Sequence, residues 1–340
     1  MKKTLCSICL GVACSALVVS AVSCDPNVVE VDVTEDASAD YVFDKAKDAI
    51  NDKNYKDLSA YDATFNLWPP SSGPIVRRTG PVMLDVPNVY IIWYGDWTQS
   101  KAKTIVPAFL NEIDGSDWLM ISADYWMSNW VIDNGMSQTR PRFVSGRINV
   151  AQSIDVGYMR GKSLGIDGVK FIVHDVISQS KLPSDENGIY YVLTSADVTE
   201  GAWSGFCTYY CGWHDHQDVN GANIKFSFVG DPGLQCLDGC TLHERYLARG
   251  ADHSPNYDWG ADAMLSVIAH ELTEAITDPD LNAWYDQELY ENADMCAWRF
   301  EPAYKTDTGS YANVHMGTHD YLIQENWVLD GDAGHCALRK

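Results

Sequence analysis

The feature that most constrains this chain is residues 269–279, AHELTEAITDP, a near match to the zinc-peptidase helix H-E-x-x-H in which Glu274 replaces the second histidine. On an α-helix, His270 and Glu274 leave the same face one turn apart, so both side chains can reach one cation. Glu271 then projects to where a water held by that ion would lie, which is the place of a catalytic base. The stretch therefore predicts a metal-binding helix.

The chemistry of this motif favours zinc as the cofactor. Zinc accepts carboxylate oxygen as well as imidazole nitrogen, although the extra carboxylate makes the site harder and lowers the expected Lewis acidity of the ion. Apolar residues alternate with the polar ones, so the predicted helix, with Asp262 as its N-cap, is apolar on most sides. Semi-buried carboxylates around a histidine require a counter-cation, which a charged surface helix does not.

A catalytic zinc needs a third protein ligand, and the sequence leaves four candidates for it. Glu291 and Asp294 lie about twenty residues after the motif, where peptidases with a glutamate as third ligand carry it, and Asp294 could instead orient the histidine. Asp280 follows the motif histidine by ten residues, as in metzincins, and His214 lies in a dense polar patch. These alternatives stay open at the level of sequence.

Other polar stretches have simpler explanations. Residues 277–282, TDPDLN, place oxygen ligands at alternating positions as calcium loops do, but they lack the glycine and final glutamate of an EF-hand. Asp278 and Pro279 are expected to end the helix, which makes calcium the weaker alternative to zinc. His315 and His319 are interpreted as surface histidines, and so is His214 if it is not a ligand.

The N-terminus reads as an export signal. Residues 1–23 combine two lysines, a short apolar segment and small residues before Cys24, which is either the first mature residue or a lipid-attachment site. Six cysteines from residue 207 onward then read as disulfides rather than zinc ligands, with Cys296 and Cys336 expected to form one pair. No later segment is long and apolar enough to predict a membrane helix.

Charge and patterning indicate one folded domain behind an acidic arm. The 340 residues carry a formal net charge of −23, which argues against binding nucleic acid. Residues 24–79 are predicted to be a linker or prosegment-like arm, and 80–340 the folded domain. Strands are expected at 88–95, 142–150, 189–194 and, at an edge, 224–230, with helices at 100–113, 169–177 and around the motif. This order predicts a disulfide-stapled α/β (α+β) fold with a zincin-like mixed sheet.

Several segments together resemble the EXORDIUM, or phosphate-induced protein, family and its bacterial-type relatives. They keep their order from about residue 80 onward and comprise 80–83, 89–97, 205–207, 210–214, 228–230, the Cys236/Cys240 pair, 266–271, 282–285, 293–296, and Gln324 with Trp327. The resemblance implies a secreted extracellular or cell-wall protein connected with growth and cell expansion. Five motif residues fall where the family carries polar residues of its own, namely His270, Glu271, Glu274, Glu291 and Asp294.

Three functional hypotheses follow. The first is a zinc metallopeptidase that hydrolyses peptide bonds, with Glu271 as the general base. The second is a non-catalytic extracellular or cell-wall protein acting in growth or cell-expansion signalling. The third is carbohydrate binding by aromatic side chains, which buried core tryptophans would explain equally well; the candidates are Trp118, Trp126, Trp130 and Trp203.

Overall fold

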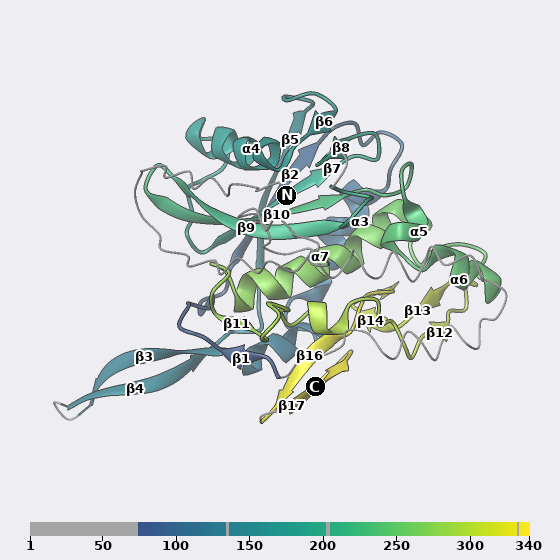
Figure 1. Cartoon of the computed structure of the whole chain (residues 1–340). Helices are drawn as coiled ribbons and strands as arrows, with labels where there is room; N and C mark the ends of the chain where they lie inside the picture. The colour runs from purple at the N-terminus through teal and green to yellow at the C-terminus, as the bar shows by residue number, and fades with distance from the viewer. Residues whose placement is uncertain (1–73, 134–135, 202–204, 332) are drawn as a thin grey trace, which may run out of the picture. The chain divides into compact units, whose positions relative to one another are not determined.

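The structure is a computed structural model that describes residues 74–133, 136–201, 205–331 and 333–340 (Figure 1). The predicted signal peptide at 1–23 lies outside the described residues. The same holds for Cys24, for the acidic arm up to residue 73 and for Trp203. The predictions for these parts stay predictions.

A five-stranded mixed sheet forms the centre of the described chain, with the strands in the spatial order β5 (Asn149–Gly157), β2 (Asn88–Tyr94), β7 (Gly188–Thr194), β10 (Ala222–Gly230) and β9 (Gly212–Val219). The first four run parallel, and β9 is antiparallel to β10. β2 and β7 are almost entirely buried, as strands with both faces covered must be. The strands predicted at 88–95 and 189–194 are confirmed.

Two strand predictions were wrong in detail. The strand predicted as an edge, β10, lies between β7 and β9, so β9 is the edge strand on that side of the sheet. The segment 142–150 is no single strand, because β4 ends at Phe143 and β5 begins at Asn149. Gly146 turns the chain between them with φ +64°, a conformation that strains any residue with a Cβ.

Helices cover both faces of the sheet (Figure 1). α4 (Ile166–Ser178) packs on one face, while α3 (Ala102–Ile113) and α7 (Trp259–Thr277) pack on the other. Successive β9 side chains alternate between the faces: Asp215 pairs with Lys170 of α4, and the neighbouring His214 points toward Glu274 of α7. All three predicted helices are confirmed. The packing of α7 against β9 places His214 beside the motif.

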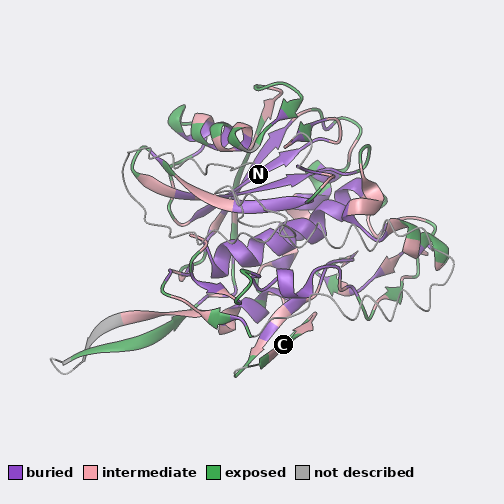
Figure 2. Ribbon diagram, in the orientation of Figure 1, coloured by how far each residue is buried: buried purple, intermediate pink, exposed green. Residues whose placement is uncertain are grey.

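Helix α7 is buried along nearly its whole length, from Gly260 to Thr277 (Figure 2). Its N-cap is Asp258, whose Oδ1 accepts a 3.0 Å hydrogen bond from the Ala261 backbone. The prediction of Asp262 as the cap was therefore wrong, because the helix starts one turn earlier and Asp262 lies inside it. The helix ends at Asp278, before a proline, as predicted. The motif charges are thus fully inside the protein.

Three disulfides staple the fold: Cys207–Cys236, Cys211–Cys240 and the predicted Cys296–Cys336. They confirm the disulfide-stapled α/β fold, while its zincin-like character stays a prediction. The remaining elements are β1 (Val76–Arg77), η1 (Leu119–Asp124), β3 (Trp126–Asp133), β4 (Met136–Phe143), β6 (Ser163–Leu164), β8 (Thr199–Glu200), α5 (Leu237–Cys240), α6 (His243–Ala248), β11 (Trp284–Tyr285), η3 (Asp294–Cys296), β12 (Tyr304–Lys305), β13 (Tyr311–Ala312), β14 (Val314–Met316), β15 (His319–Tyr321), β16 (Asn326–Asp330) and β17 (Ala333–Ala337).

Candidate metal centre

Three parts of the chain bring six polar side chains together between the sheet and the loop that follows α7. The side chains, which we call the centre, are His270, Glu271 and Glu274 of α7, His214 of β9, and Glu291 and Asp294 of the loop. Each of the six residues is only 2 to 5% exposed. The structure therefore gathers every predicted site residue into one buried cluster, together with one of the open alternatives, His214.

Backbone caps hold the loop in place beside α7. Asp278 Oδ1 accepts hydrogen bonds of 2.6 Å from the backbone of Asn282 and of Ala283. Asp286 then caps the next turn by accepting from the Tyr290 backbone at 3.0 Å. Short acidic side chains commonly stabilise turns in this way. These turns return the chain to α7 and bring Glu291 to the cluster.

His270 presents one ring nitrogen to two carboxylates. Its Nε2 lies 3.0 Å from Glu274 Oε1 and 3.4 Å from Asp294 Oδ1. Its Nδ1 lies 3.5 Å from Oε1 of Gln324, which also accepts from the Trp298 backbone. An acceptor beside Nδ1 favours the tautomer that carries its proton there, which leaves Nε2 free to bind a metal. Residues that contact metal-binding histidines commonly act in this way. Sequence reasoning assigned no role to Gln324, since nothing local marks it.

Asp294 is oriented by its own turn. Its Oδ2 accepts a 2.9 Å hydrogen bond from the Glu291 backbone, and its backbone donates to Glu274 Oε1 at 3.1 Å. The other carboxylate oxygen, Oδ1, has no hydrogen-bond partner in the described chain and points at His270. Asp294 thus contacts the motif histidine through an oxygen that has no hydrogen bond in the described chain, a geometry compatible with either of its two predicted roles.

His214 and Glu291 form the other side of the centre. His214 Nε2 lies 2.9 Å from Glu291 Oε2 and 3.9 Å from Glu274 Oε2. The second oxygen of Glu291, Oε1, is buried and has no hydrogen-bond partner among the described residues. The interpretation of His214 as an exposed histidine was therefore wrong, because its strand turns it toward α7.

The electrostatics of the centre reflect burial among like charges. Burial lowers the pKa of His270, but the carboxylates around it, Glu274 first, outweigh this and raise that pKa well above its ordinary value. Burial, reinforced by neighbouring carboxylates, raises the pKa of Glu271, of Glu274 and of Glu291. Without a cation, the centre would consequently retain protons that a bound metal displaces.

The donor set fits a divalent cation. Ligand atoms of His270, Glu271 and Glu274 lie within 4.8 Å of one another, and so do those of His214, Glu274 and Glu291. Buried carboxylate oxygens without hydrogen-bond partners are costly unless a cation satisfies them. Imidazole with carboxylate is a donor combination that zinc accepts.

Of the alternative third ligands, Asp280 has another partner. Asp280 is half-buried and accepts a 2.9 Å hydrogen bond from Asn223, away from His270. Asp278 commits one carboxylate oxygen to the turn after α7, as predicted for a helix end. His315 and His319 are exposed at the surface, where each pairs with a carboxylate. The surface interpretation of these two histidines is confirmed.

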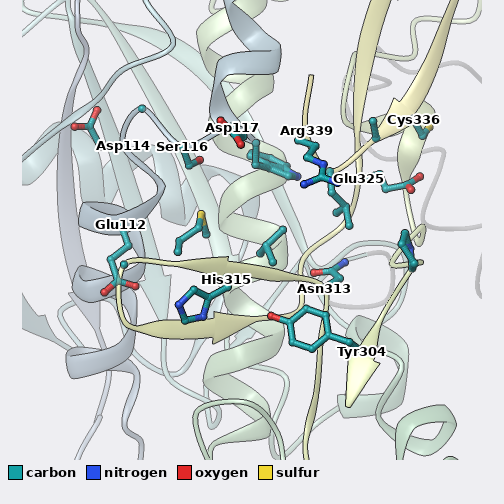
Figure 3. A pocket seen from close by; sticks show the side chains of 18 residues that line it. Glu112, Asp114, Ser116, Asp117, Tyr304, Asn313, His315, Glu325, Cys336 and Arg339 are labelled. Atoms are coloured by element: carbon teal, nitrogen blue, oxygen red, sulfur yellow. The ribbon is translucent and has the colours of Figure 1, made fainter. Parts of the chain in front are cut away.

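A cavity of about 940 Å³ lies at another place, beside the C-terminal hairpins (Figure 3). Glu112, His315 and Arg339 are among the residues that line it, whereas none of the six centre residues does. Trp118 also lines it and donates from its indole nitrogen to the Gln324 carbonyl at 2.9 Å. The cavity is therefore not an entrance to the centre.

The tryptophans offered for carbohydrate binding do not form an exposed platform where they are described. Trp118 is buried, and Trp126 packs edge-on against Trp284 with Arg77 over its ring. These contacts match the interpretation of the aromatic residues as core.

The family model for the phosphate-induced protein 1 conserved region matches residues 76–336. The chain belongs to this family. Its relatives include three EXORDIUM-like proteins of Arabidopsis thaliana. Protein EXORDIUM-like 5 is 32% identical over 222 residues, which are 62% of this chain and 59% of the relative. Protein EXORDIUM-like 3 is 29% identical over 275 residues, which are 73% of this chain and 78% of the relative. Protein EXORDIUM-like 2 is 26% identical over 265 residues, which are 71% of this chain and 82% of the relative.

The match to EXORDIUM-like 5 thus spans less than two thirds of that protein's length. No solved structure gives a significant match. None of the described helices is both long and apolar enough to cross a bilayer. The three disulfides are compatible with an exported protein. The match of the family model confirms the predicted family.

Proposed function

We propose that this protein is an exported EXORDIUM-like protein that binds zinc at the centre, with a structural rather than catalytic role. The observation that carries the proposal is the unpaired oxygen of Asp294, which is buried and directed at His270 beside Glu274. These three side chains would hold the ion. A buried site that satisfies carboxylates in this way contributes its binding free energy to the stability of the fold.

Burial of the centre supports the structural over the catalytic role. Glu271 is 2% exposed, and the other members of the centre are no more than 5% exposed. A general base must come within hydrogen-bond reach of the group from which it takes a proton. A peptide substrate cannot reach Glu271 in this conformation, which favours the non-catalytic member of the two leading hypotheses.

The metallopeptidase is retained as the second candidate because of one observation. A carboxylate oxygen of Glu271 lies within 4.8 Å of ligand atoms of both His270 and Glu274. When bound, zinc supplies Lewis acidity for hydrolysis. In that case Glu271 would take the proton of the attacking water and transfer it to the leaving amine, after a movement that opens the centre to a peptide.

The family resemblance supplies the biological setting of the proposal. We infer an extracellular or cell-wall role in growth or cell expansion, with a lipid anchor at Cys24 as a further hypothesis. The ligand of such a role would be a peptide or a cell-wall component.

Metal analysis of purified protein tests the proposal. Protein prepared without chelator is expected to carry zinc and to lose thermal stability when the zinc is removed, because the carboxylates of the centre then lack their counter-charge. His270→Ala should lower the amount of zinc bound at the centre, whereas the matched control His315→Ala, at an exposed histidine, should leave it unchanged. Failure of the unaltered protein to carry zinc or to bind added zinc would overturn the proposal.

Glu271→Gln separates the two candidate roles. If neither this variant nor the unaltered protein cleaves any member of a broad peptide library while both retain zinc, the structural role is supported. Cleavage by the unaltered protein that disappears in Glu271→Gln would instead establish the metallopeptidase.

A further inference from the structure

The carboxylate of Glu274 divides the centre into two halves. Its Oε1 lies 3.0 Å from Nε2 of His270, and its Oε2 lies 3.9 Å from Nε2 of His214. One side chain therefore presents a separate oxygen to each of the two imidazoles. This is the arrangement of a carboxylate that bridges two cations.

Each half also has a carboxylate of its own. Asp294 lies beside His270 and leaves Oδ1 without a hydrogen bond in the described chain. Glu291 lies beside His214 and leaves Oε1 in the same state. Both residues are at least 95% buried, so these oxygens cannot be satisfied by bulk water. The two halves are thus alike in composition: each has one histidine, one carboxylate that the other half does not share, and one oxygen of Glu274.

We propose that the centre holds two divalent cations bridged by Glu274. His270 and Asp294 bind the first, and His214 and Glu291 bind the second. The inference rests on the proposed binding of zinc and extends it from one ion to two. Two-metal sites in proteins place their ions about 3.5–4 Å apart. The two oxygens of one carboxylate can serve such a pair.

The balance of charge supports a second ion. Five carboxylates are buried here: those of Glu271, Glu274, Asp278, Glu291 and Asp294. None of them forms an ion pair with lysine or arginine within the described residues. Glu274, Glu291 and Asp294 lie beside the two imidazoles instead. One divalent cation offsets two of the five negative charges, and two cations offset four. Buried carboxylates need this compensation.

Asp278 is a further buried carboxylate whose charge acts on the second half of the centre. Its Oδ1 is used by the turn after α7, which leaves Oδ2 buried and without a hydrogen bond in the described part of the chain. The carboxylate interacts electrostatically with both Glu291 and His214. Asp278 therefore adds negative charge on the side of His214 and Glu291.

The stoichiometry of bound zinc tests the inference on the unaltered protein. Dialysis against zinc followed by elemental analysis is expected to give two ions per chain. One ion per chain would overturn the second site while leaving the proposed zinc binding intact, and no ion would overturn both. Because no variant is involved, the result does not depend on whether a substitution disturbs folding.

Variants then assign the two sites. His214→Ala and His270→Ala are each expected to reduce the stoichiometry from two ions to one, while the exposed control His315→Ala keeps two. Cobalt substitution of the unaltered protein gives an independent readout, since two equivalents should be needed to complete its visible absorption spectrum. Saturation at one equivalent would contradict the two-ion centre.

Discussion

Glu200, at the end of β8, is a buried carboxyl group with one strong hydrogen bond. Its Oε2 accepts a hydrogen bond of 2.6 Å from the Tyr210 hydroxyl. Burial raises the pKa of Glu200 to about 7, and the hydrogen bond from Tyr210 offsets part of that effect. Replacing Glu200 by Gln keeps the size and the acceptor oxygen but removes the ionisation. The variant therefore isolates the free energy of burying this charge.

The sign of the effect follows from proton binding in the two states. The carboxyl titrates near 4.5 in the unfolded chain, so between pH 4.5 and about 7 the folded protein binds more protons than the unfolded one. The stability contributed by Glu200 is then fully present below pH 4.5 and is lost as the pH rises through 7. At about 1.4 kcal/mol per pH unit, the loss is about 3 kcal/mol.

Glu200→Gln is accordingly expected to match the parent protein near pH 4 and to exceed its free energy of unfolding by about 3 kcal/mol at pH 8. Urea unfolding, followed by tryptophan fluorescence at several pH values, measures the difference. Glu288→Gln, at an exposed carboxyl, is the matched control and should follow the parent throughout. Parallel curves for Glu200→Gln and the parent between pH 5 and 8 would refute the reasoning.

Two further predictions concern the Cys296–Cys336 disulfide and the N-cap of α7. Replacing Cys296 and Cys336 by Ala opens a crosslink across 40 residues and should lower the free energy of unfolding by about 4 kcal/mol in urea, and a loss below about 1 kcal/mol would contradict this. Asp258→Ala removes the N-cap of α7 and should cost about 1 kcal/mol in thermal unfolding, most of which Asp258→Asn should restore; equal losses in both variants would argue against capping.

Much of the fold could be predicted because its signals are local. β2 and β7 are uninterrupted apolar runs between turn residues, and α7 carries apolar residues on every side of its polar motif. The convergence of His270 and Glu274 follows from helical periodicity alone. Their closeness to Glu291 and Asp294 was also predictable, since a short acidic turn soon after a helix returns toward it.

What could not be predicted depends on pairing between distant segments. His214 belongs to the centre because β9 runs antiparallel to β10 and aims alternate residues at α7, and neither fact is visible near residue 214. The same holds for the two crossed disulfides, in which Cys207 pairs with Cys236 and Cys211 with Cys240. Cys207 and Cys211 are four residues apart, as are Cys236 and Cys240, so the sequence alone does not choose among the possible pairings.

The edge strand β9 is hydrogen-bonded to the sheet through β10 on one side. It is also held by the ion pair between Asp215 and Lys170 of α4, and by His214, which lies beside Glu291 and Glu274. If this strand detaches, water reaches the carboxylates before the parallel strands separate. Release of an ion and the first opening of the sheet would then be a single event. If the proposed zinc is bound, the rate at which a chelator extracts it would therefore measure how often the margin of the sheet opens.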